Sequence, residues 1–168
     1  MSPKGRRYSL KSSEAKALMN KISEQLGPGL SCFIDAKANI EVVEAEDKLE
    51  LLLVDRKPVL FKIGERIYPT LSFKRALESL PRAVVDMGAV GHVCNGADIM
   101  APGIVRFDGE FSQGDLIVVV DVKHGKPLAL GEVLYDFEAA KATRKGAVIK
   151  SIHFVGDQVW GAIKAIGE

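Results

Sequence analysis

Three histidines and two cysteines are the side chains of this sequence that most often act as nucleophiles or metal ligands. His92 and Cys94 stand two apart, and residues at that spacing do not share a face of a helix. Nothing in the sequence holds a base in reach of the thiol, as a cysteine nucleophile requires. His124 and His153 lie far away, whereas zinc needs three or four converging ligands. We therefore expect no catalytic residue and no metal, and interpret Cys32 and Cys94 as free, buried thiols in a reduced compartment.

Acidic residues are frequent after residue 85 but do not predict an acid–base pair. We interpret Asp86 as a helix cap and Asp115 as a turn residue, which are common roles for this side chain. Asp98, Asp108 and Glu110 complete the group. The sequence therefore gives no positive support to an enzymatic activity, and the protein is predicted not to be an enzyme.

The stretch "DMGAVGHVCNGADIMAPGIV", residues 86–105, combines four glycines with a proline. The spacing of its glycines does not match a dinucleotide fingerprint, and the chain has no GxxxxGK[ST] phosphate loop, so no cofactor is expected. Glycine allows a partner to approach the main chain closely. The stretch therefore suggests a surface that contacts a nucleic acid through its backbone.

Length and composition are those of a globular protein with one domain or two small ones. The chain has 168 residues, of which 47% are hydrophobic and 27% charged, and its formal net charge is +1. No apolar run approaches the roughly 20 residues that span a bilayer. The first residues, "MSPKGRRYSLKSS", lack the apolar core of a secretory signal. We expect a cytoplasmic protein.

The first half predicts a small α+β domain, residues 1–81. A helix begins near Ser12 or Ser13 and ends at Gly27, and a second helix covers 71–79. Between them lie five β-rich segments, of which 48–55 and 58–63 form a hairpin. The others are 31–36, 40–46 and 65–71. Residues 1–11 contain Lys4, Arg6, Arg7 and Lys11 and no acid, which predicts a basic arm or simply a solvated, disordered terminus.

The second half, residues 82–168, consists of short strands with closely spaced turns, which predicts a small β-barrel or sandwich. Residues 116–122 and 128–134 form a long hairpin around His124–Gly125. Residues 147–155 and "QVW" at 158–160 form another. Short helices are expected near 87–94 and at 137–143. Helices and antiparallel strands together give the α+β fold class.

Four segments of the second half resemble a PUA domain, the module named after pseudouridine synthases and archaeosine transglycosylases. They are "VVDMGAVGHVCNGADIMAPGIV", "FSQGDLIVVVDV", "PLALGEVL" and "RKGAVIKSIHFVGDQVW". The first half, with "YPTL" before a helix, resembles the pre-PUA domain of the MCT family of translation proteins. The resemblance implies a PUA β pseudobarrel, RNA binding, a link to the small ribosomal subunit, and contact with tRNA during initiation or recycling. A translation-factor partner is a further implication.

The resemblance also implies the RNA-facing residues. These are Gly88, Ala89, Gly96, Ala97, Met100, Ala101, Pro102 and Gly103. Small residues there would let the sugar–phosphate chain pack closely, although such loops also serve only as tight barrel corners.

The charge balance requires a local cluster of cations if the second half binds RNA. Residues 82–168 contain 9 basic and 11 acidic residues, whereas residues 1–81 contain 14 basic and 11 acidic residues. Phosphate neutralisation supplies most non-specific affinity for nucleic acids. The cluster is expected at Arg144, Lys145 and Lys150, beside Arg82 and the basic arm.

We therefore predict a non-enzymatic, cytoplasmic RNA-binding protein that acts in translation on tRNA or ribosomal RNA. Two alternatives stay open at this point. The protein could be a PUA specificity subunit of an RNA-modifying enzyme, or a protein-interaction adaptor whose negative second half has lost its affinity for RNA.

Overall fold

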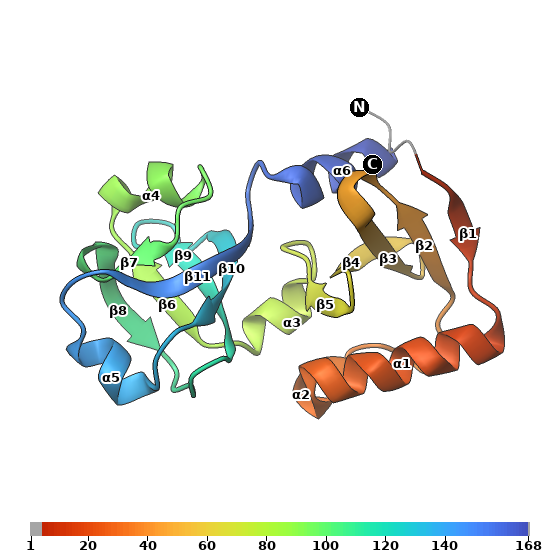
Figure 1. Ribbon diagram of the computed structural model, residues 1–168, viewed down its shortest axis with the longest axis horizontal. Coiled ribbons are helices and arrows are strands. Elements are labelled where there is room, and N and C mark those ends of the chain that lie inside the picture. Colours follow the sequence, from red (N-terminus) through yellow and green to blue (C-terminus); the bar gives the residue numbers. More distant parts are fainter. Residues whose placement is uncertain (1–4, 168) are drawn as a thin grey trace. The chain divides into compact units, whose positions relative to one another are not determined.

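The chain forms two compact units in a computed structural model that describes residues 5–167 (Figure 1). The second unit is Leu80–Asp157, and the first contains the residues up to Ser79 together with the segment from Gln158 onward. The second unit therefore differs from the predicted second domain, 82–168, because the segment from Gln158 onward groups with the first unit. The α+β fold class is confirmed. Lys4 lies outside the described residues.

The first unit is an antiparallel five-stranded sheet accompanied by helices. The strand order is β1-β2-β3-β4-β5. Gln25 of the long helix fixes that helix to the edge strand, because its side-chain amide donates to Glu65 O at 2.6 Å and accepts from Ile67 N at 2.8 Å. The strands are β1 Arg7–Ser9, β2 Ile40–Glu44, β3 Leu49–Val54, β4 Lys57–Ile63 and β5 Arg66–Pro69, and the helices are α1 Ser12–Leu26, α2 Pro28–Ser31, η1 Glu46–Lys48, α3 Lys74–Glu78 and α6 Gln158–Gly167.

Three segments of the first unit have a secondary structure that differs from the sequence prediction. Residues 31–36 are not a strand, because α2 begins directly after Gly27 and turns follow it. The basic segment forms the ordered strand β1, which pairs with β2. The segment "QVW" begins helix α6 instead of closing a hairpin, and Gln158 Nε2 of that helix donates to Glu46 O at 2.9 Å.

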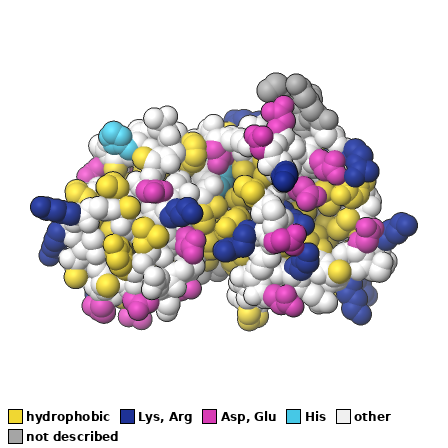
Figure 2. Space-filling model, in the orientation of Figure 1, with side chains coloured by type: hydrophobic (Ala, Val, Ile, Leu, Met, Phe, Trp, Pro, Cys, Tyr) yellow, Lys and Arg dark blue, Asp and Glu magenta, His cyan; other side chains and the backbone are white. Residues whose placement is uncertain are grey.

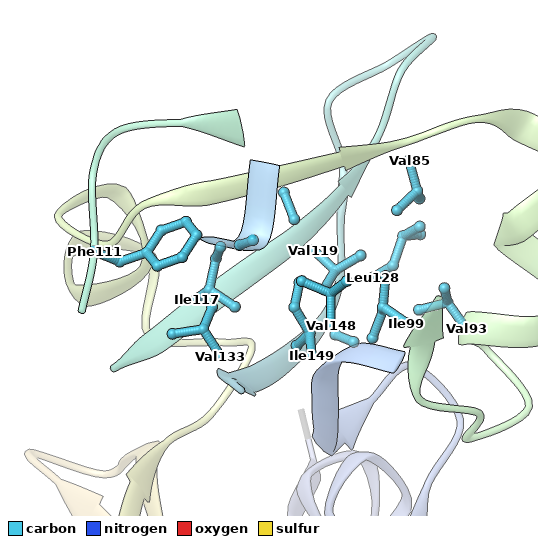
Figure 3. Packing of buried hydrophobic residues seen from close by; sticks show 13 residues of the cluster. Val85, Val93, Ile99, Phe111, Ile117, Val119, Leu128, Val133, Val148 and Ile149 are labelled. Carbon is cyan, nitrogen blue, oxygen red and sulfur yellow. The ribbon is translucent and has the colours of Figure 1, made fainter. Parts of the chain in front are cut away.

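The second unit is a six-stranded sheet that curls around its own core (Figure 3). Its order is β7-β11-β10-β9-β6-β8, in which β6 and β9 are parallel and the other neighbours antiparallel. The predicted hairpin around His124–Gly125 is confirmed as β9 and β10. The elements are β6 Arg82–Val85, α4 Met87–Val93, β7 Ile99–Met100, η2 Ala101–Gly103, β8 Ile104–Asp108, β9 Leu116–Asp121, β10 Pro127–Val133, α5 Phe137–Ala142 and β11 Ala147–Phe154.

Close packing between β10 and β11 explains why residue 131 of this core is a glycine. A Cβ on Gly131 would lie 2.2 Å from Ile149 Cγ2 and 2.9 Å from Lys150 O, so no larger residue fits. The β10–β11 register shifts at the same place, between Leu130 and Gly131. Side chains from β6, β9, β10, β11 and α4 fill the interior; they include Val85, Val93, Ile117, Val119, Leu128 and Ile149.

Candidate nucleic-acid interface

A cleft of about 660 Å³ opens in the second unit between α4 and the segment β7–η2. Its lining combines small residues with a few apolar and polar side chains. Six of the eight residues expected from the sequence line it, namely Gly88, Ala89, Ala97, Met100, Pro102 and Gly103. Asp86, His92, Val93, Asp98 and Ile99 complete the lining. The structure therefore brings the glycine-rich stretch together around one hollow.

Asp86 holds the two walls of the cleft together. Its carboxylate Oδ1 accepts from Ala89 N at 2.9 Å and so caps α4, as predicted. Its own backbone N–H donates to Gly103 O at 3.0 Å, which ties the start of α4 to η2. The geometry of the cleft is thus fixed by one side-chain and one backbone hydrogen bond at a single aspartate.

The two walls of the cleft lie close together at Gly103. A Cβ at this position would lie 3.1 Å from the Cβ of Ala89, closer than ordinary van der Waals contact. Gly103 does not have a positive φ, so the close approach, and not a special backbone conformation, explains the glycine. Any larger side chain here would push the walls apart or fill the cleft.

Gly96 and Ala101 do not line the cleft. Gly96 has φ of 89°, and a Cβ there would lie 3.0 Å from the ring of Phe154, so it forms a turn against the core. Ala101 faces the opposite side of η2. For Gly96 the geometry favours the structural interpretation of a glycine- and alanine-rich loop, whereas Ala101 lines a second hollow.

The cleft is apolar and weakly acidic. Val93 and Ile99 are buried in its wall, whereas Met100 is 49% exposed at its rim. Asp98 Oδ1 accepts from Ser151 N at 2.9 Å, which anchors the loop before β7. Among the described residues, no lysine or arginine lines this cleft.

Three polar residues of the cleft, Asp86, His92 and Asp98, were not assigned to the RNA-facing surface from the sequence, although Asp86 was predicted as a helix cap. Asp98 follows Gly96 by two positions in the same loop, and this closeness to a residue expected to face RNA could have placed Asp98 on the same surface. His92 offered no such signal, since it stood out only as one half of an unsupported pair with Cys94.

A second hollow of about 360 Å³ lies on the other side of η2, and we call it the basic groove. Three cations from different elements line it: Arg106 of β8, Lys141 of α5, and Arg144 of the following loop. Arg106 pairs with Asp108 at 3.1 Å and Lys141 with Glu138 at 3.3 Å. Arg144 forms no ion pair with any residue between 5 and 167. The floor of the basic groove consists of Ala101, Ile104, Phe107 and Ala140.

The predicted cationic cluster does not converge on one hollow. Arg144 lines the basic groove, and Lys and Arg side chains project at the edge that carries the loop between α5 and β11 (Figure 2). In the described part of the chain, Lys145 and Lys150 are exposed and line neither hollow. Lys150 stands opposite Glu132 in the sheet, and Arg82 stands opposite Asp108.

The N-terminal basic residues are engaged within the first unit. Arg6 and Arg7 pair with Glu44 at 3.0 Å and Glu41 at 2.8 Å, respectively. The hydrogen bond from Arg7 lowers the pKa of Glu41 below its usual value. Lys11 precedes α1, and its backbone N–H donates to Glu14. The segment is therefore not a free arm at Arg6 and Arg7.

The cysteines and His153, first considered for catalysis, lie where a structural role explains them. Cys94 is half-buried and burial raises the pKa of its thiol, but Cys32 is exposed, so the expectation of a buried thiol was wrong for Cys32. His153 is fully buried, with its Nδ1 2.8 Å from Asp157 Oδ2. From residue 5 to 167, no three His, Cys, Asp or Glu side chains group as a metal site requires. No helix in that range is long and apolar enough to span a bilayer.

Comparison with known proteins identifies two family matches. Residues 81–155 match the PUA domain, and residues 6–75 match a domain of unknown function, DUF1947. An uncharacterized protein of Methanocaldococcus jannaschii is 38% identical over 92% of this chain and 95% of its own length. Translation machinery-associated protein 20 of Saccharomyces cerevisiae is 31% identical over 92% of this chain and 91% of its own. Malignant T-cell-amplified sequence 1 of Rattus norvegicus is 30% identical, over 90% and 87%.

Solved structures resemble the whole chain as well. A hypothetical protein from Pyrococcus horikoshii superposes with a TM-score of 0.76 at 31% identity, covering 93% of this chain and 98% of that one. A PUA-domain structure from Aeropyrum pernix gives a TM-score of 0.81 at 24% identity, covering 97% and 93%. The second likeness concerns the fold alone.

Proposed function

Because the chain belongs to the MCT family, with translation machinery-associated protein 20 and malignant T-cell-amplified sequence 1 as relatives, we propose that it binds RNA and acts in translation. The observation that carries the proposal is the cleft between α4 and η2. It lies in the part of the chain that matches the PUA domain, and six residues expected to face RNA line it. The protein acts by binding, without a chemical step of its own.

The lining of the cleft suits unpaired nucleotides at the end of a structured RNA. Small residues such as Gly88 and Gly103 leave room for a sugar–phosphate chain beside the main chain. The exposed Met100 offers an apolar surface to a base. Carboxylate oxygens of Asp86 and Asp98 can accept from an exocyclic amino group or a ribose 2′-hydroxyl.

One relative is named for its association with the translation machinery. As the resemblance to the MCT family implies, we propose tRNA or small-subunit ribosomal RNA as the target, during initiation or recycling in the cytoplasm. A tRNA acceptor end is a structured end with unpaired bases, and recognition of such ends depends on shape and on splayed bases. A translation factor is the expected protein partner. Co-sedimentation with small ribosomal subunits tests this context.

Substitution of Gly103 by valine tests the cleft. We expect Gly103→Val to weaken binding of an RNA hairpin with a single-stranded 3′ tail by about tenfold, or 1.4 kcal/mol, because the new side chain enters the contact with Ala89. The measurement is fluorescence anisotropy at several salt concentrations. Gly91→Val is the matched control, since Gly91 is exposed on α4, has open space around it and does not line the cleft.

Both variants must melt at a temperature close to that of the parent protein. Unchanged affinity in a folded Gly103→Val variant would remove the cleft from the RNA interface. Co-purification with a modifying enzyme, without ribosomes, would instead favour a specificity subunit. Absence of RNA binding by the parent protein at low salt would favour a protein adaptor.

A further inference from the structure

An RNA end in the cleft would bring phosphate charge to a site without basic side chains. Among the described residues, the cleft is lined by Asp86, Asp98 and His92 but by no lysine or arginine. Phosphates are bound in proteins mainly by Lys and Arg, which release the counterions of the nucleic acid. The cations that balance an RNA in this cleft must therefore lie beside it.

The basic groove begins where the cleft ends. Pro102 and Gly103 line the cleft, whereas their chain neighbours Ala101 and Ile104 line the groove. Consecutive Cα atoms are about 3.8 Å apart, so a single turn of η2 separates the two hollows. A strand that leaves the cleft over η2 enters the groove.

We propose that the basic groove, formed by Arg106, Lys141 and Arg144, holds the backbone phosphates of the RNA strand whose end occupies the cleft. This inference rests on the proposed function of the cleft. It assigns the two hollows different tasks: the cleft holds the terminal nucleotides, and the groove neutralises the chain that leads to them.

The chemistry of the groove fits a nucleic-acid backbone. Arg144 is exposed and has no ion-pair partner in the described part of the chain, so its guanidinium is available to a phosphate. The pairs of Arg106 with Asp108 and of Lys141 with Glu138 are exposed and can be exchanged for a phosphate at little cost. The apolar floor at Ile104 and Phe107 can pack against a ribose or a base.

The position of the groove favours RNA over an acidic peptide. Its cations are gathered in a unit that otherwise carries more acidic than basic residues, so they form a local exception to the charge of that unit. They also lie in a hollow that shares η2 with the cleft, since Ala101 lines the groove whereas Pro102 and Gly103 line the cleft. A peptide would have no comparable reason to bind next to the cleft.

The test compares two variants of the full-length protein that each lose two positive charges. One is Lys141→Gln with Arg144→Gln in the groove. The other is Lys123→Gln with Lys126→Gln on the β9–β10 turn, where both side chains are exposed and line neither hollow. Binding is measured by anisotropy from 50 to 300 mM salt, with RNA hairpins that carry single-stranded 3′ tails of two or eight nucleotides.

We expect the groove variant to bind the long-tailed RNA about tenfold more weakly at low salt, and its log–log salt slope to fall by about one to two units, or roughly one per lost phosphate contact. The turn variant should stay within twofold of the parent protein. The short-tailed RNA should lose less affinity than the long-tailed RNA in the groove variant, because fewer of its phosphates reach the groove.

The outcomes separate the groove from the proposed function. Equal slopes for both double variants, with binding still weakened by Gly103→Val, would overturn the groove and leave the cleft intact. Absence of RNA binding by the parent protein would overturn both. Loss of binding to a polyglutamate peptide, with RNA binding unchanged, would identify the groove as a protein-binding surface.

Discussion

Asp121 is a buried carboxylate at the end of β9 that organises the β9–β10 turn. Only 4% of the residue is exposed, and its two oxygens accept from His124 N and Lys126 N. The backbone amide of His124 is the main cause that holds the pKa of Asp121 below its usual value, and the amide of Lys126 adds to it. The ionised form is therefore the one that the folded turn stabilises.

Replacement of Asp121 by asparagine should make stability depend on pH in a defined way. Because the folded pKa is lowered, the stabilisation is present above the unfolded pKa of about 3.9 and is lost as pH falls through the folded pKa. We expect Asp121→Asn to lower the unfolding temperature by several degrees at pH 7 and by clearly less at pH 2.5. Glu138→Gln, which alters only an exposed ion pair, is the control. A pH-independent difference would contradict the role of the charge.

Single residues also show how far the sequence could predict the interface. The small residues of the cleft were identified because the motif that carries the resemblance is local. Gly96 and Ala101 were expected on the same surface but do not line the cleft, since neighbours in a turn point to opposite sides and only the fold decides which side is hollow. Arg106 and Lys141 were missed because they lie 35 residues apart and meet only through packing of α5 against the sheet.

The N-terminal strand is the element whose role differs most from its prediction. Residues 1–11 contain no acid, and this pattern predicts a solvated arm. The partners of Arg6 and Arg7, Glu44 and Glu41, are distant in sequence and do not enter that prediction. The segment pairs instead with β2, whose Val42 and Val43 are buried. Long-range pairing of this kind is invisible to local charge patterns.

Deletion of residues 1–9 should therefore destabilise the first unit. It removes β1 and leaves the edge of β2 without its hydrogen-bonded neighbour. We expect a fall of about 5 °C or more in the unfolding temperature, since 1 kcal/mol corresponds to 4–8 °C in a domain of this size. The double variant Arg6→Gln with Arg7→Gln keeps the strand and should change the temperature much less. If both changes had the same effect, the ion pairs and not the strand would be responsible.

Helices and strands were predicted correctly where the hydrophobic periodicity and the turn residues indicate the same element. The helix α1 and the β3–β4 and β9–β10 hairpins satisfy both conditions, and all three are confirmed. Residues 31–36 failed because a short run with Phe33 and Ile34 looks like a strand, whereas a proline at the first helical position after Gly27 favours a helical turn. In α6, the spacing of Val159, Ala162, Ile163 and Ile166 is helical, but the likeness to a PUA hairpin outweighed it.

At the level of the whole molecule, the first unit is discontinuous in sequence. Removal of residues 158–168 should reduce the protection of β3 amides from hydrogen exchange and leave β9 and β10 unchanged, because α6 packs with the first unit. Gly161→Ala is the opposite control: Gly161 has open space around it, and alanine favours a helix by about 1 kcal/mol. That variant should increase protection in β3. Loss of protection in β9 and β10 alone would place α6 in the second unit.

The sheet of the second unit sets the distance between the two points where the chain enters and leaves it. Arg82 is beside Val118, Val118 beside Leu130, and Leu130 beside His153. Three strand spacings of about 4.8 Å in this curled sheet place these ends at most roughly 14 Å apart. If the second unit is unfolded, docking α6 onto the first unit must close a loop of about 80 residues, at an entropic cost of order 4 kcal/mol. Once the second unit has folded, its sheet already holds the ends of that loop. Folding of the second unit therefore promotes completion of the first through chain connectivity, an effect that requires no contact between them.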